Sequence, residues 1–79
     1  MKYPDGRIVR VGDRVKLGRD EGGVVVCSMD TGEYSEDYPE VQWGYLKEGV
    51  MINFPLHGLI HYKEPEEGLE LLERAEKNG

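Results

Sequence analysis

The chain has 79 residues, with 16 Asp and Glu against 10 Lys and Arg, which gives a formal net charge of −6 at pH 7. A chain this short forms a single domain, residues 1–79, whose small core leaves no room for a deep cleft beside a separate cofactor domain. The acidic balance argues against general nucleic-acid binding and favours a basic protein partner.

The single Cys27 lies in an apolar run and rules out an internal disulfide. No apolar segment reaches the length of a signal peptide or of a membrane span, so we expect no membrane association. Together these features predict a protein of the reducing cytoplasm.

The first third of the chain predicts two β-strands. Residues 8–17 alternate apolar and basic side chains, with an interruption at Gly12-Asp13, as in a half-buried antiparallel strand. Residues 18–23 are rich in glycine and predict a turn. Residues 24–29 are apolar on both faces, which is typical of a central strand. Residues 1–20 carry six basic and three acidic side chains, a balance of +3.

The next segment is acidic and aromatic. Five carboxylates and no basic residue lie between Asp30 and Glu40, and residues 21–48 have a balance of −6. Because this segment lies between two strand-like runs, we expect a long exposed loop. Aromatic rings supply contact area at low entropic cost, and carboxylates supply steering. The residues that we predict to contact a partner are Glu33, Tyr34, Glu36, Asp37, Tyr38, Glu40 and Tyr45.

The rest of the chain predicts one helical turn, a hairpin and a C-terminal helix. Within residues 41–47, Trp43 and Leu46 have the spacing of one helical turn. Residues 50–54 and 59–62 predict the two strands of a hairpin. Residues 65–77 begin at a proline and carry leucines at helical spacing, with acid-before-base pairs four residues apart. These features predict a helix over about residues 65–77.

Short strands, glycine turns and one terminal helix predict a mainly β protein, a small, strongly bent antiparallel barrel over about residues 5–63 with a C-terminal helix. The sequence Asp5-Gly6, then residues 11–15 (VGDRV), then residues 22–25 (GGVV) resembles the opening of Src-homology-3-like barrels. It is most similar to the KOW and Tudor-type members, over about residues 5–30. The resemblance implies this fold, and for KOW members it implies RNA or ribosomal partners. The acidic second half of the chain departs from that pattern.

Other sites are weakly indicated. The spacing of the carboxylates does not match a calcium-binding EF-hand loop, and His57 and His61 are not expected to converge on a metal. Tyr34, Tyr38, Trp43 and Tyr45 could form an aromatic cage for a methylated ammonium, although Trp43 is better placed to cover the end of the core. We find no base–nucleophile pair, so we predict no catalytic residue, no metal and no cofactor.

The sequence therefore favours a small acidic protein-binding module, in its sharper form a stoichiometric inhibitor of the immunity or antitoxin type. The alternative is a KOW-like nucleic-acid or ribosome-associated module that uses the basic N-terminal strand. The chain could be a monomer or a homodimer, since its +3 and −6 segments could pair between copies and its terminal helix could exchange between them.

Overall fold

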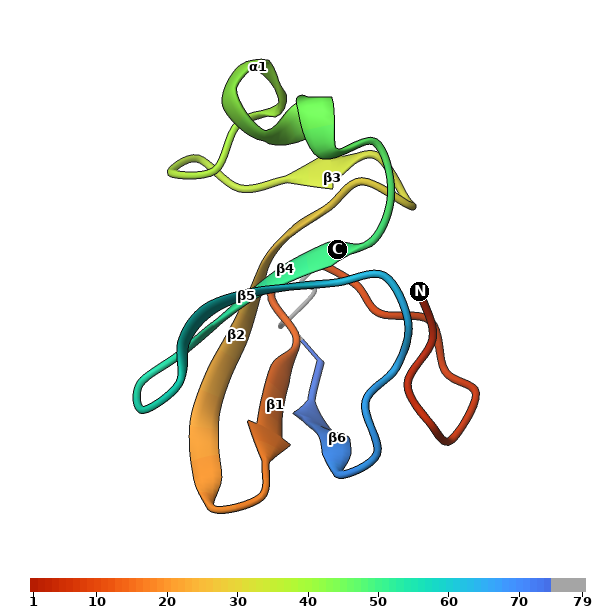
Figure 1. Ribbon diagram of the computed structural model, residues 1–79, viewed down its shortest axis with the longest axis vertical. Helices are drawn as coiled ribbons and strands as arrows, with labels where there is room; N and C mark the ends of the chain where they lie inside the picture. Colours follow the sequence, from red (N-terminus) through yellow and green to blue (C-terminus); the bar gives the residue numbers. More distant parts are fainter. Residues whose placement is uncertain (75–79) are drawn as a thin grey trace.

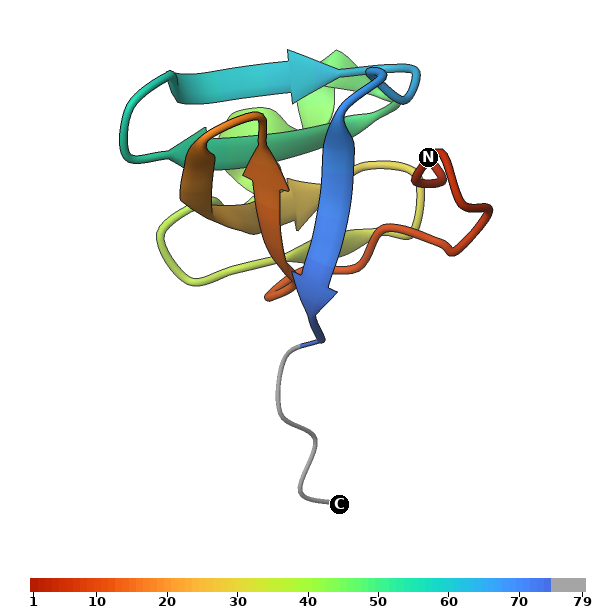
Figure 2. The ribbon, with the colours of Figure 1, turned by 90° about the horizontal axis from the view of Figure 1, so that it is seen from below.

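The computed structural model describes residues 1–74 and contains one antiparallel sheet of six strands (Figures 1 and 2). The strands are β1 (Arg14–Leu17), β2 (Asp20–Ser28), β3 (Glu33–Tyr34), β4 (Val50–Phe54), β5 (Gly58–Tyr62) and β6 (Leu69–Glu73). Their order is β5-β4-β2-β1-β6, and β3 pairs with β2 outside that path. The prediction of a mainly β, antiparallel protein is confirmed. Within the described residues the sheet remains open at β5 and β6.

The β4–β5 hairpin agrees with the sequence pattern. Val50, Ile52 and Phe54 are buried on one face, as their alternation predicts, and all five residues of β5 pair with β4 in an unbroken register. The side chains of these three residues belong to the main core, whose members are Tyr3, Val9, Val15, Val25, Val50, Ile52, Phe54, Tyr62 and Leu69.

The first strand is shorter than predicted, because the interruption at Gly12-Asp13 is a true turn. Gly12 has a φ of 91°, a value that favours glycine, and the backbone N–H of Asp13 donates to the carbonyl of Arg10 (3.1 Å). The buried Asp13 carboxylate accepts from the Arg10 backbone N–H (2.9 Å) and from the Tyr3 hydroxyl (2.5 Å). These bonds hold the turn, so β1 begins only at Arg14, although the Gly12 N–H still donates to the Val25 carbonyl of β2 (2.9 Å). Before the turn, Ile8 forms an isolated bridge with Lys2.

The prediction of a turn over the whole of residues 18–23 was wrong. Only Gly18 and Arg19 turn, and β2 begins at Asp20. Gly22 and Gly23 lie inside the strand for a packing reason. A Cβ on Gly23 would come within 2.5 Å of the Phe54 ring, and one on Gly22 within 2.7 Å of the Pro55 ring. Because these two glycines have no Cβ atom, β2 can lie against the side chains of Phe54 and Pro55 at the end of β4.

An irregularity in β2 creates a second apolar cluster. The pairing of β2 with β4 shifts register between Val25 and Cys27, as in a β-bulge. Val25 faces the main core, whereas Cys27, two residues on, belongs to a separate cluster with Met29 and Met51. The bulge therefore places the Cys27 side chain on the opposite face of the sheet, beside Met29 and Met51. These apolar side chains must be covered by another part of the chain to be shielded from water.

The predicted C-terminal helix over residues 65–77 was wrong where the structure describes it. Residues 69–73 form β6, which pairs with β1, and Leu69 is buried in the core opposite Leu17. Gly68 has a φ of 98°, which interrupts a helix. Each helical salt bridge is worth only about 0.2–0.5 kcal/mol, so the open edge of β1 and a core position for Leu69 outweigh them. Residues 75–77 of the predicted helix lie outside the described residues.

Candidate protein-binding surface

Residues 33–46, here called the cover segment, lie over the second apolar cluster. After β3 the chain makes a turn and then forms a short helix, α1 (Glu40–Trp43), continued by the 3₁₀ turn η1 (Gly44–Leu46). The helical turn predicted for residues 41–47 is confirmed. In Figure 1 the cover segment lies at the top of the molecule, above the strands.

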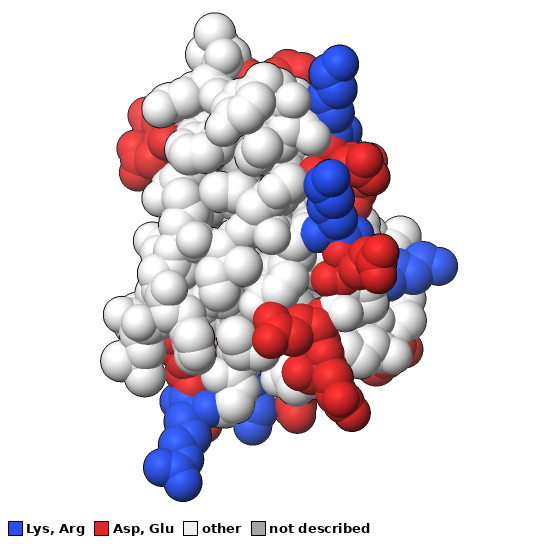
Figure 3. Space-filling model, viewed as in Figure 1, with Lys and Arg blue, Asp and Glu red and all other residues white. Residues whose placement is uncertain are grey.

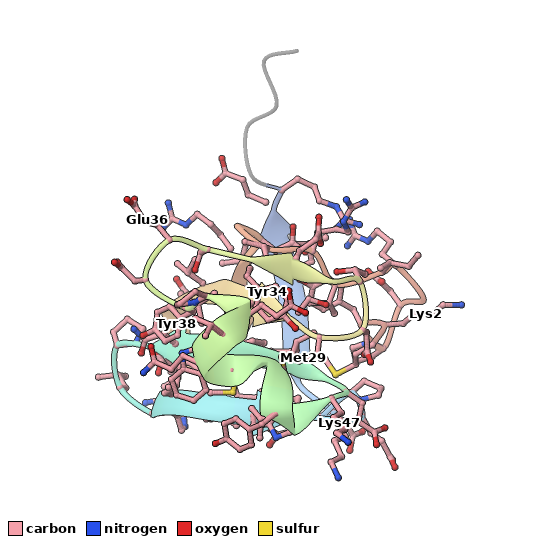
Figure 4. The ribbon with its side chains drawn as sticks, turned by 90° about the horizontal axis from the view of Figure 1, so that it is seen from above. Lys2, Met29, Tyr34, Glu36, Tyr38 and Lys47 are labelled. Carbon is pink, nitrogen blue, oxygen red and sulfur yellow. The ribbon has the colours of Figure 1, made fainter. Side chains whose placement is uncertain are left out.

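Aromatic and apolar side chains hold the cover segment to the sheet. Those that pack against Cys27, Met29 and Met51 are Tyr34, Tyr38, Trp43 and Leu46. The rings of Tyr38 and Trp43 lie 5.8 Å apart between centroids, at 36° to each other. Burial, with a smaller contribution from the charge of Glu40, raises the pKa of the Tyr34 hydroxyl. Figure 4 shows Tyr34 and Tyr38 beside the helical ribbon. Three of the four rings considered for an aromatic cage, those of Tyr34, Tyr38 and Trp43, therefore pack on the second apolar cluster.

Two of the five predicted loop carboxylates hold the segment in place. Asp30 accepts from the backbone N–H of Gly49 (2.9 Å) and from the N-terminal amine, and these bonds lower its pKa. Glu33 makes a two-pronged ion pair with Arg10, with its nearest contact at 2.7 Å to Nη2, and also accepts from Thr31 Oγ1 (2.8 Å). The Arg10 guanidinium is the main cause that lowers the pKa of Glu33 to about 2.

The other three carboxylates are free in the part of the chain that the structure describes. Glu36 and Asp37 form the corner of a tight turn closed by the Tyr38 N–H and the Ser35 carbonyl (3.0 Å). Both are exposed, as is Glu40 at the start of α1. None of the three makes an ion pair within residues 1–74. In Figure 4 the Glu36 side chain points outward at one end of the segment, far from Lys47.

Two large side chains of the helical turn face solvent beside these acids. Val41 is 93% exposed and Tyr45 is 70% exposed, and their spacing of four residues places them on the same side. Sequence reasoning included Tyr45 but missed Val41, although that spacing could have indicated it. We call Glu36, Asp37, Glu40, Val41 and Tyr45 the acidic-aromatic surface. Of the predicted contact residues, it excludes Glu33, Tyr34 and Tyr38.

Two arginines of the N-terminal segment, and Arg74 after β6, are paired with acids. Arg7 binds Asp5 (2.6 Å), Arg10 binds Glu33, and Arg74 binds Asp13 (3.0 Å). A hollow of about 550 Å³ lies among these three guanidinium groups. Pairing reduces the charge that this face can offer to phosphates.

The two histidines have separate structural contacts. His57 Nδ1 lies 2.9 Å from the buried Asp20 carboxylate, and His61 Nε2 lies 2.8 Å from the carbonyl oxygen of Glu48. Within residues 1–74 there is no group of three His, Cys, Asp or Glu side chains that could hold a metal ion, and no helix is long and apolar enough to cross a membrane. No family model, curated protein or solved structure matches the chain.

Proposed function

We propose that this protein is a small binding module whose acidic-aromatic surface docks a cationic protein partner, as a stoichiometric inhibitor of the immunity or antitoxin type. One observation supports this most strongly. The cover segment is fixed to the sheet by Tyr34, Tyr38 and Trp43, yet it leaves Val41 93% and Tyr45 70% exposed beside three carboxylates that make no ion pair within residues 1–74. Such exposed apolar and aromatic groups are typical of contact surfaces.

The rigidity of the segment strengthens the proposal. The ion pair between Glu33 and Arg10 fixes the first residue of the segment, and the bonds of Asp30 fix the chain three residues before it. A surface that is already ordered loses little conformational entropy when a partner binds, so more of the contact energy appears as affinity. The free carboxylates would accelerate the approach of a basic partner and set its orientation.

The proposal extends to the fold. We infer that the bent sheet is a Src-homology-3-like barrel of the KOW or Tudor type. The turn at Gly12-Asp13 before β1 and the register shifts within β1 and β2, which bend the sheet, support this inference. In this class of fold, binding sites lie on the connections between strands, as the cover segment does between β2 and β4.

The test is affinity capture from native lysate followed by mass spectrometry. The wild type is compared with the double variant Glu36→Lys/Tyr45→Ala, which should remain folded because both side chains are exposed. The matched control is Glu21→Lys, which makes the same charge change at an exposed position on β2. We expect a basic protein that is retained by the wild type and the control and lost with the double variant.

Two results would oppose the proposal. Retention of the same proteins by all three forms would mean that the acidic-aromatic surface does not bind them. Ribosomal proteins or RNA retained by all three, and released by salt, would instead support the KOW-like alternative. For a captured basic protein, titration calorimetry should then give one copy bound per chain.

A further inference from the structure

The outer edge of β5 is unprotected. Among the strands of residues 1–74, β5 is the last of the sheet and pairs with β4 alone. Figures 2 and 4 view the molecule from opposite sides, and in both β5 lies at the margin of the sheet, where part of the helical ribbon overlaps it. An edge strand presents a row of unpaired N–H and C=O groups, and this row is complementary to another extended strand.

The opposite edge shows how a protected strand differs. β6 carries Glu70 and Glu73, and its pairing with β1 contains a register shift. Charged side chains and bulges are the usual means by which proteins prevent edge-to-edge association. β5 has the sequence Gly-Leu-Ile-His-Tyr, without Lys, Arg, Asp, Glu or Pro, and its register is regular over all five residues. The two edges of the sheet therefore differ in charge and in regularity of register, the two features that discourage the addition of another strand.

The surface beside β5 is also uncharged. Leu59 is 40% exposed, and the pairing registers place it in one row with Asn53 and the 38% exposed Val24. Leu56, in the hairpin turn, is 77% exposed. Figure 3 shows an uncharged face that extends from the helical segment across the hairpin, with the acidic and basic side chains gathered at its margins.

We propose that β5 is a self-association site, at which β5 of a second copy of this chain adds in antiparallel orientation. A two-fold axis through Ile60 makes the contact self-complementary, so that Leu59 of one copy lies opposite His61 of the other. A second copy fits this edge because two chains of net charge −6 can approach here without opposing acids. A heterologous strand is the competing occupant.

The proposal also sets the extent of the contact. A stable dimer buries about 1,200–2,000 Å² in total, which is more than five paired residues can supply. The neighbouring hairpin turn with the exposed Leu56 must therefore join the interface. Leu59 lies near the start of β5, next to this turn, which makes it the position where a charge should disturb the contact most.

The experiment is sedimentation of the full chain over a concentration series, for the wild type, Leu59→Lys and Leu72→Lys. Leu72, 48% exposed on β6, is the matched control, because it receives the same change at the protected edge. We expect the wild type to shift with concentration from a 9.0 kDa species toward one of twice that mass. Leu59→Lys should raise the dissociation constant at least tenfold, and Leu72→Lys should leave it unchanged.

Circular dichroism of each variant confirms that it is folded before its mass is interpreted. A wild type that stays monomeric up to millimolar concentration overturns the proposal and leaves β5 to a heterologous strand. A dimer that Leu59→Lys does not weaken, or that Leu72→Lys weakens equally, also overturns it. Hydrogen exchange adds a direct readout, since protection of the β5 amides should rise with protein concentration only if β5 forms the contact.

Discussion

Two tyrosines of the cover segment should respond very differently to the same substitution. Tyr34 is half-buried against Cys27, whereas Tyr45 is 70% exposed. Truncation of a fully buried aromatic side chain to alanine costs about 3–5 kcal/mol, so the half-buried Tyr34→Ala should lower the free energy of unfolding by about 2 kcal/mol. Tyr45→Ala removes an exposed ring and should change it by less than about 0.5 kcal/mol.

Urea denaturation of the two variants and the wild type measures both values, because a domain of this size is expected to unfold in one cooperative step. In thermal unfolding, Tyr34→Ala should lower Tm by about 8–16 °C, while Tyr45→Ala should leave it nearly unchanged. Equal effects of the two substitutions would refute the reasoning. They would mean that the segment does not pack on the sheet through Tyr34 and is not the rigid platform that the proposed function requires.

The remaining predictions concern two carboxylates with structural partners. The pKa of Glu33 is lowered to about 2 from an ordinary 4.5, so its pair with Arg10 stabilises the fold above pH 4.5 and this contribution is lost as the pH falls toward 2. Since Arg10 is 55% exposed, we expect Glu33→Gln to cost about 1 kcal/mol at pH 7 and to flatten the pH dependence of stability in that acidic range, as measured by urea titration at several pH values. Glu36→Gln is the control, because Glu36 makes no ion pair within residues 1–74. It should leave both the stability at pH 7 and the pH dependence of stability unchanged. Asp13→Ala removes the acceptor of the buried Tyr3 hydroxyl and should lower the free energy of unfolding by about 3 kcal/mol in the same assay, whereas an effect as small as that of the exposed Asp37→Ala would contradict this role.

The elements that the sequence predicts correctly are those in which local pattern and tertiary contacts agree. In residues 50–62, strict alternation places Val50, Ile52 and Phe54 on one face, and the hairpin turn is short. The helical turn around Trp43 follows from the spacing of Trp43 and Leu46, which both pack on the same cluster. Neighbours in sequence are sufficient to define these elements.

The failures occur where a distant contact decides the conformation. Nothing near Gly23 in the sequence indicates that the Phe54 ring needs the space of its missing side chain. The C-terminal leucines fit a helix locally, but β1 offers backbone partners and a buried position for Leu69. Tertiary contacts of this kind regularly outweigh local propensity, whose differences amount to less than about 1 kcal/mol per residue.

For the candidate surface, the sequence predicts which kinds of residue are present but not which of them are exposed. The sequence identifies an acidic, aromatic segment, but it does not divide the segment into structural and free residues. That division depends on Arg10, which lies 23 positions before Glu33, and on the bulge that brings Cys27 beneath Tyr34. Once these contacts are known, Tyr34 can no longer serve as an interface variant, because its loss would disturb the fold, and Tyr45 takes that place.

The two proposed contacts occupy different parts of the molecule, which allows each to be tested without the other. Glu36→Lys/Tyr45→Ala changes the cover segment and should leave a β5-mediated dimer intact. Leu59→Lys changes the edge strand and should leave partner capture intact if one copy of the acidic-aromatic surface is sufficient. If Leu59→Lys abolishes both dimer and capture while the chain stays folded, the partner must contact two copies at once. In that case the dimer would form part of the binding site, because two weak contacts on one rigid pair give an avidity that neither copy has alone.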